Sequence, residues 1–173
     1  MIKYGYKGCD VMDRLELVRA KVDNIIAKLS DEEDRKFAYL HSYGVAQCAV
    51  FLAIIRNLDV ELAGIAAMLH DIAVYAYNCP HREHAQKSKE LAKEILDDMA
   101  LFTEEEIIVI TNAIAVHSDK MTRKDSRFAE MIKDSDVLQH YLYNPVIPLH
   151  DQDKFRLFYL LEDIKKIKHQ EQE

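Results

Sequence analysis

Apolar residues recur every three or four positions along nearly the whole chain, a spacing that places their side chains on one face of a helix. No convincing segment alternates apolar and polar residues with the two-residue period of a strand. The pattern predicts an all-α fold, a helical bundle of about six to seven helices. The helices are expected at about residues 11–29, 30–57, 59–75, 83–99, 103–118, 125–141 and 151–168.

Two of the expected helix starts carry capping signals. Ser30 with Glu33, and Thr103 with Glu106, have the spacing of a capping box, in which the two side chains satisfy free amides of the first turn. No internal repeat, long linker or composition break divides the 173 residues. The sequence therefore predicts one helical domain over residues 1–173.

The composition fits a globular chain and excludes several classes of protein. Hydrophobic residues make up 49% and charged residues 31%, while only 4 Gly and 3 Pro are present, which excludes collagen-like, low-complexity and turn-dense β architectures. The net charge of −7 leaves no basic surplus for binding a nucleic-acid duplex. Aromatic residues at 9%, without Trp, also argue against a stacking platform for single strands.

The cysteines and the apolar runs indicate the compartment. Cys9, Cys48 and Cys79 are odd in number and lack C-x-x-C spacing, which fits neither a thiolate zinc cage nor a disulfide framework. The N-terminal stretch lacks the pattern of a secretory signal, and we expect no run of about 18 apolar residues that could cross a bilayer. We expect a cytoplasmic protein without a membrane partner.

The most informative positions are imidazoles and carboxylates that interrupt the apolar faces. An unpaired carboxylate buried there would cost on the order of several kcal/mol, and these faces offer few basic partners. One divalent cation, or two, would stabilise the whole set. Ligands of this kind without thiolate suit Fe, Mn, Co, Ni or Zn, whereas the abundance of His argues against Mg or Ca. The positions are His41, His70, Asp71, His84, His117 and Asp136.

Each position also has a simpler interpretation when it is taken alone. His41 or His117 alone would more often be a hydrogen-bonded core histidine, and Asp136 could pair with Lys133 or face solvent. Together the coincidences in one small domain favour a shared metal site, which a helical bundle can assemble from several helices. Gly44, one turn after His41, leaves room for another group.

The order of these residues resembles the H…HD…D signature of the HD superfamily of metal-dependent phosphohydrolases. His41 would be the first His, and His70-Asp71, at the end of the apolar stretch AAMLHDI, would be the HD pair. Asp136, in KDSDVL, would be the closing Asp. His84 and His117 resemble the additional histidines of HD subfamilies that hold two metals. The resemblance covers about residues 40–141, with flanking helices on both sides.

The resemblance implies a ligand set and an activity. His41, His70, Asp71 and Asp136 would be the primary ligands, with Asp71 able to bridge two ions and to act as a base. The implied enzyme is a phosphomonoesterase or phosphodiesterase that attacks a small phosphorylated compound, most plausibly a nucleotide, with a metal-bound hydroxide.

Further histidines and basic residues extend this set. His84 and His117 would hold the second ion or contact the phosphate, with His81 as the competitor of His84. Lys120, three residues after His117, is the preferred cation for the phosphate. The alternative cations, each also readable as part of a solvated loop, are Arg82, Lys87, Arg123 and Lys124.

Several residues near the motif are expected to lie outside the site. Asp134 is predicted to be solvated. The histidines without a motif position are read as structural or surface residues, and they are His140, His150 and His169. The candidates for the wall of a base-binding pocket, with core or homodimer contacts as the alternative, are Tyr141, Tyr143, Phe155 and Phe158.

Two other functions remain open at this point. A non-catalytic HD module would use the metal and pocket to sense a ligand or to stabilise a partner-binding platform. A mixed-valent di-iron HD protein would carry out oxygen-dependent cleavage. Neither the metal nor the substrate follows from the sequence.

Overall fold

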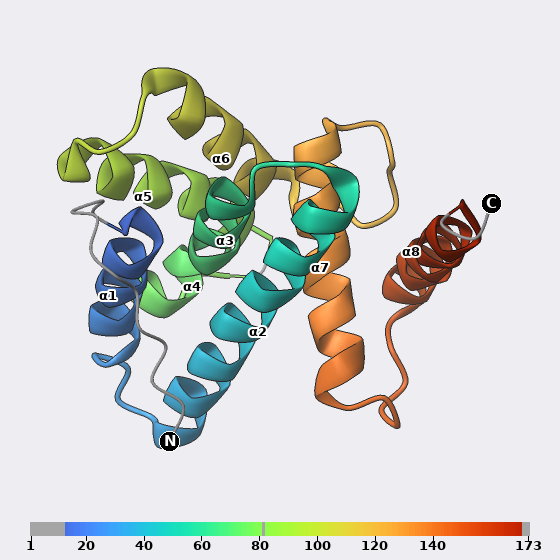
Figure 1. The fold of residues 1–173 in the computed structure, drawn as a ribbon. Helices are drawn as coiled ribbons and strands as arrows, with labels where there is room; N and C mark the ends of the chain where they lie inside the picture. Colours follow the sequence, from blue (N-terminus) through green and yellow to red (C-terminus); the bar gives the residue numbers. More distant parts are fainter. Residues whose placement is uncertain (1–12, 81, 171–173) are drawn as a thin grey trace, which may run out of the picture.

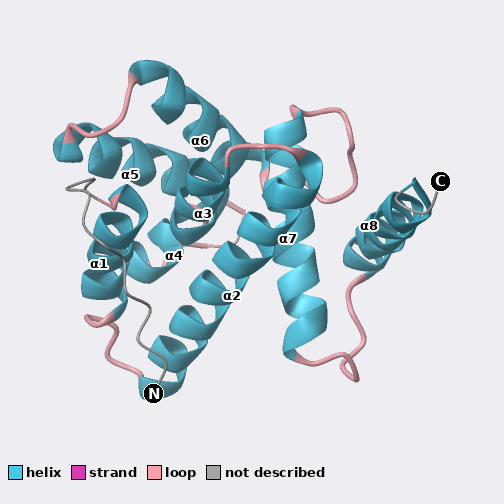
Figure 2. Ribbon diagram, in the orientation of Figure 1, coloured by secondary structure: helices cyan, strands magenta, loops and turns pink. Residues whose placement is uncertain are grey.

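The computed structural model describes residues 13–80 and 82–170, with the side chains described as far as residue 166. This part of the chain contains helices and loops and no strand (Figure 2), as the periodicity predicts. It forms eight helices. They are α1 (Arg14–Ile26), α2 (Glu32–Arg56), α3 (Val60–Leu69), α4 (Ile72–Tyr77), α5 (His84–Met99), α6 (Glu104–Val116), α7 (Arg127–Tyr143) and α8 (Asp151–Gln170).

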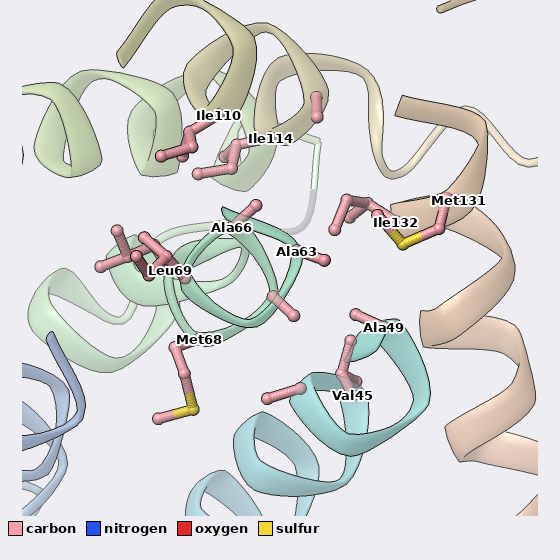
Figure 3. Packing of buried hydrophobic residues seen from close by; sticks show 14 of the residues in the cluster. Val45, Ala49, Ala63, Ala66, Met68, Leu69, Ile110, Ile114, Met131 and Ile132 are labelled. Atoms are coloured by element: carbon pink, nitrogen blue, oxygen red, sulfur yellow. The ribbon is translucent and has the colours of Figure 1, made fainter. Parts of the chain in front are cut away.

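The centre of the bundle is α3, whose residues from Leu62 to Leu69 are all buried. The long helix α2 packs along α3 and α7, while α5 pairs with α6, and α6 also contacts α3 and α7 (Figure 1). Side chains from four helices meet around α3 (Figure 3), among them Val45, Leu69, Ile114 and Ile132. This core fixes the helix ends that carry the polar residues.

The helix α8 packs against α7 at the end of the chain (Figure 1). Its packed side buries the apolar side chains Leu157 and Leu160 and two charged ones, Asp153 and Arg156. The charged pair is unusual for a packed helix face, because charged groups are seldom fully buried unless they are paired.

The helix predicted over residues 59–75 is in fact two helices. His70 and Asp71 separate α3 from α4, and Asp71 has φ −111° and ψ 16°, outside the helical region. The break matters for the site, because neighbours on a regular helix point about 100° apart. The sequence pattern missed it because apolar residues continue on both sides.

The two predicted capping boxes have different outcomes. Thr103 and Glu106 form theirs, with the Thr103 amide donating to Glu106 Oε2 at 2.9 Å and the Glu106 amide donating to Thr103 Oγ1 at 3.2 Å. At α2 the prediction is wrong by one residue, since Asp31 is the cap and accepts from the Asp34 amide at 2.9 Å. Asp31 has extended backbone angles, which aim its carboxylate at the free amides of the first turn.

Two apolar stretches are longer than expected, since the sequence analysis predicted no run long enough to cross a bilayer. Glu32–Arg56 and Val60–Tyr77 are long and apolar enough to cross a membrane by length and composition. Their apolar windows are 50% and 67% buried inside the fold, as in core helices, which pass the same test. The N-terminal start predicted near residue 11 and Cys9 lie outside the described residues.

Candidate metal centre

The six predicted ligands lie together at one end of α3. His41 comes from α2, His70 and Asp71 from the junction of α3 and α4, and His84 from the first turn of α5. The remaining two, His117 and Asp136, come from the end of α6 and from α7. The five ligands other than Asp71 are at most 5% exposed. Their roles as ligands remain predictions, but their convergence is a property of the fold.

The first group of ligand atoms surrounds the Oδ2 atom of Asp71. The Nε2 atoms of His41 and His70 each lie 3.5 Å from this oxygen and 3.1 Å from each other. Asp136 approaches from α7, with its Oδ1 atom 3.6 Å from His41 Nε2. Distances of this size between ligand atoms are those of a set that can converge on one ion.

The second group surrounds the other oxygen of the same carboxylate. His84 Nε2 lies 3.3 Å and His117 Nε2 lies 3.2 Å from Asp71 Oδ1, and the two imidazole nitrogens are 2.9 Å apart. Asp71 therefore presents one oxygen to each pair of histidines. This is the arrangement that the sequence analysis expected of a bridging carboxylate.

Hydrogen bonds on the far side of the rings determine which nitrogens face the centre without a proton. His70 Nδ1 donates to the Ala67 carbonyl at 2.7 Å, and His117 Nδ1 donates to the Ile114 carbonyl at 2.7 Å. Because a carbonyl oxygen only accepts, each neutral ring carries its proton on Nδ1 and a lone pair on Nε2. Such backbone partners are the usual support of metal-binding histidines.

His41 is oriented in the same way by a side chain. Its Nδ1 atom donates to Gln139 Oε1 at 2.9 Å, so the neutral ring has a lone pair on Nε2 that faces the Nε2 lone pair of His70. Two lone pairs at this distance repel each other unless a cation lies between them. The buried Oδ1 atoms of Asp71 and Asp136 also lack a hydrogen-bond partner in the described part of the chain. The donor set therefore fits a divalent metal.

The electrostatics of the site keep His70 neutral and Asp71 ionised, and they favour a positive charge beside His41. Burial lowers the pKa of His70 to about 4, so its ring is neutral at physiological pH. Burial also opposes the charge on Asp71, but His70, His117 and His41 together hold the pKa of that carboxyl well below its ordinary value. At His41 burial lowers the pKa, yet Asp71 and Asp136 outweigh it and raise the pKa overall. A positive charge is thus favoured between these groups.

Comparison with known proteins identifies the family. Residues 38–144 match the sequence model of the HD domain. The chain belongs to the HD domain family. A crystal structure described as a predicted HD superfamily hydrolase, from an uncultured Thermotogales bacterium, has the same fold with a TM-score of 0.57 and 20% identity, over 92% of this chain and 99% of that one. A search of curated proteins finds no match.

Three further charged residues of the HD domain, Lys120, Lys133 and Asp134, have partners or burial that the sequence did not indicate. Lys120 is 5% exposed and pairs with Asp136 Oδ2, so the partner of Asp136 is Lys120 and not Lys133. Lys133 is buried as well and pairs with Asp125 at 2.5 Å. Asp134 was predicted to be solvated, but it is buried. It can be buried because two arginines compensate its charge.

The HD site also contains two side chains that the sequence analysis did not assign to it. His140, one turn after Asp136, has its Nε2 atom 3.5 Å from Asp136 Oδ1 and stacks on His41 with ring centroids 5.2 Å apart. Gln139 is the group that fills the space beside Gly44 and orients His41. The spacing of Gln139 and His140 from Asp136 on the same helix was the signal available in the sequence.

A cavity of about 350 Å³ opens onto the HD site. Its wall includes Phe37, Cys79, Lys120, His140 and His150, so His150 is a wall residue although it is exposed. The aromatic residues predicted to form the wall are absent from it as far as the chain is described; Tyr143, Phe155 and Phe158 are exposed instead, and Tyr141 is partly buried.

The cysteines and the remaining basic candidates take no part in the centre. Burial raises the pKa of the Cys48 thiol to about 11 and also raises the pKa of Cys79, so both thiols stay protonated and are poor ligands. Arg82 and Lys87 pair with Glu83, and Arg123 pairs with Asp163, while Lys124 is exposed. The competitor His81 and the side chain of His169 lie outside the described residues.

Proposed function

We propose that this HD-domain protein is a metal-dependent phosphohydrolase that acts on a small phosphorylated compound, with nucleotides as the preferred class. The observation that carries the proposal is the Asp71 carboxylate, whose two oxygens face two separate imidazole pairs. His41, His70, Asp71 and Asp136 would hold one divalent ion. Asp71, His84 and His117 would hold a second.

The reaction follows from this ligand set. Divalent ions bound there would lower the pKa of a coordinated water and neutralise charge on the phosphoryl oxygens. The carboxylates of Asp71 and Asp136 both have pKa values far below the ordinary range, Asp136 because burial is outweighed by Lys120 and the histidines. They therefore stay ionised and act as ligands; the additional role of Asp71 as a base is weakened by its low pKa.

Residues of the cavity wall supply substrate contacts. The Lys120 ammonium, already beside Asp136, is the cation closest to where a phosphoryl group would lie, because the wall of the cavity includes both residues. His140 offers a ring nitrogen on the same wall. These two groups bind and orient phosphate oxygens, which is how a protein of net negative charge can hold an anionic substrate.

Support for a nucleotide comes from the size and the rim of the cavity. Its volume of about 350 Å³ falls within the range of small-molecule sites. Phe37 is 51% exposed on the wall and stacks on His41 with an interplanar angle of 5°. An exposed aromatic face at the mouth is suited to a planar base.

A substrate screen tests the proposal. Purified protein loaded with Mn, Fe or Co is incubated with nucleoside monophosphates, dinucleoside polyphosphates, cyclic dinucleotides and non-nucleotide phosphomonoesters, and the release of phosphate or nucleoside is measured. We expect hydrolysis of at least one nucleotide, lost in Asp71→Ala and His70→Ala together with bound metal. Gln86→Ala, on the exposed side of α5, is the matched control and should retain both. Metal-loaded protein that is inert on the whole panel would contradict the proposal and favour a non-catalytic HD module.

A further inference from the structure

The position of Lys120 depends on a helix that lies beyond the residues matched to the HD family. Lys120 belongs to the loop between α6 and α7, where regular helical hydrogen bonds do not hold the backbone. Arg156, on α8, is 1% exposed and reaches into this loop. Residues of α8 follow the matched range 38–144.

One guanidinium group holds two carbonyls of the loop. Arg156 Nε donates to the Lys120 carbonyl at 3.2 Å, and Nη2 donates to the Thr122 carbonyl at 2.5 Å. The planar guanidinium presents its donors in a fixed fork, so both carbonyls are fixed relative to each other. The backbone of Lys120 is therefore anchored directly by α8.

The charge of the same guanidinium is compensated by α7. Arg156 Nη1 pairs with Asp134 Oδ1 at 2.7 Å, and Nη2 lies 2.8 Å from Glu130 Oε2. Arg56 holds the other oxygen of Asp134 at 2.6 Å. Asp134 lies two residues before Asp136 on α7, and the Lys120 ammonium pairs with Asp136. Arg156 therefore connects the backbone of Lys120 to the same helix that its side chain contacts.

A second contact joins α8 to the metal centre. Asp153, buried in the first turn of α8, has its Oδ2 atom 3.9 Å from His140 Nδ1, while the other nitrogen of His140 faces Asp136. His150, Gln152 and Asp153 also contribute to the wall of the cavity. Thus the first turn of α8 contacts the site, and Arg156 in its second turn anchors the loop that carries Lys120.

We propose that Arg156 is a positioning residue of the active site: its guanidinium fork holds the 120–122 backbone so that the Lys120 ammonium is placed between Asp136 and the phosphate of the substrate. The catalytic part of this inference rests on the proposed phosphohydrolase function. The anchoring of Lys120 can be measured without activity. Helix α8 is accordingly a part of the catalytic unit.

The decisive variant is Arg156→Lys, which keeps the positive charge between Asp134 and Glu130 but cannot donate from a planar fork to both carbonyls. We expect kcat, measured on a nucleotide that the substrate screen shows to be hydrolysed, to fall by about 10- to 100-fold. A small misplacement of a catalytic group has an effect of this size. Bound metal per chain should stay unchanged. Arg123→Gln is the matched control, because Arg123 also joins this loop to α8, through Asp163 at 3.3 Å and the ring of Tyr159. It should retain full kcat.

Double variants distinguish positioning from a general loss of structure. If Arg156 acts through Lys120, then Arg156→Lys combined with Lys120→Met should be no slower than Lys120→Met alone. Multiplicative losses would overturn the proposal, since they would show that Arg156 acts elsewhere. A kcat of Arg156→Lys equal to that of the unmodified protein would overturn it as well.

Amine labelling tests the anchoring independently of any substrate. In the full chain, acetic anhydride followed by mass spectrometry should modify Lys120 slowly, because its side chain is buried. In Arg156→Lys the modification of Lys120 should accelerate by at least about 10-fold, while the fully buried Lys133 stays protected and reports an intact fold. Unchanged protection of Lys120, or equal exposure of both lysines, would overturn the proposal. A protein that is inert on every substrate but shows the selective exposure of Lys120 would contradict only the proposed function.

Discussion

At the scale of the residue, Asp71 determines what the centre can hold. One of its oxygens lies near His41 and His70 and the other near His84 and His117. A carboxylate can contact two cations in this way, whereas an imidazole nitrogen contacts one. Both groups of candidate ligands therefore depend on Asp71, whereas each histidine belongs to one group.

The number of bound metal ions should reflect these two groups of candidate ligands and the Asp71 carboxylate that they share. We expect two ions per chain in the unaltered protein, one in His117→Ala, and none in Asp71→Ala, when each is dialysed against Mn and analysed by inductively coupled plasma mass spectrometry. Gln86→Ala serves as the control. An Asp71→Ala protein that retains two ions would show that Asp71 does not bridge.

Gln139 should affect the metal without touching it. Gln139→Leu removes the acceptor that keeps the proton of His41 on Nδ1, so the ring can present a protonated nitrogen to the centre. Loss of such a partner typically weakens metal binding about 10- to 100-fold. Titration calorimetry should show this loss at one site of the two. Gln152→Leu, on the cavity wall, provides a comparison in which both sites keep their affinity.

At the scale of the element, the ends of helices place several of the candidate ligands. His70 and Asp71 stand where α3 ends, His84 where α5 begins, and His117 where α6 ends. A residue at a helix end departs from the regular rotation between neighbours, so His70 and Asp71 can face the same centre. The starts of α2 and α6, in contrast, carry side-chain caps.

The two predicted capping boxes provide a matched pair of tests. Thr103→Ala should lower the free energy of unfolding by about 1 kcal/mol, because the Glu106 amide loses its acceptor. Ser30→Ala should change it much less, because Asp31 caps α2. Urea denaturation of both variants measures the difference. Equal effects would show that the caps are not used as described.

Acid should weaken the tie between α1 and α6. The Arg14 side chain, followed by the Thr103 amide, lowers the pKa of Glu106 below its ordinary value of 4.5. The stabilisation by this ionised group is therefore present above about pH 4.5 and is lost as the pH falls through the lower pKa of the folded protein. The urea midpoint of Glu106→Gln should lie below that of the unaltered protein at pH 7, and the gap should close in acid. A constant gap would contradict this assignment.

At the scale of the whole molecule, the metal centre links helices that are distant in sequence. Its candidate ligands come from α2, the α3–α4 junction, α5, α6 and α7, so the unfolded chain does not present them together. A ligand that binds only the folded state shifts the equilibrium toward it. We therefore expect metal occupancy and fold stability to be coupled.

Excess Mn should raise the thermal midpoint of the protein. At a free concentration of about 100 times the dissociation constant, the expected stabilisation is about 2.7 kcal/mol. Differential scanning calorimetry with and without Mn measures it, and His70→Ala should abolish most of the shift. If that variant responded to Mn as strongly as the unaltered protein, the stabilising ion would have to bind elsewhere.

The helical class and the positions of most candidate ligands were predictable because their signals are local. Apolar spacing determines which face of a helix is buried, and imidazoles or carboxylates on that face stand out against it, as His41 and Asp136 do. The Thr103 box was predictable because both partners lie within one turn. The order of these residues and the stretches around His70-Asp71 and Asp136 also gave the resemblance to the HD family, which the match over residues 38–144 confirms.

The rest was decided by contacts between residues far apart in the chain. The burial of Asp134 depends on Arg56 and Arg156, and the pairing of Asp136 with Lys120 depends on a loop held by α8. Whether a charged side chain is solvated or buried is determined by the partner that compensates its charge, and no periodicity in the sequence names that partner. The sequence by itself determined the helices and their polar interruptions; the tertiary structure decided which of those interruptions face each other.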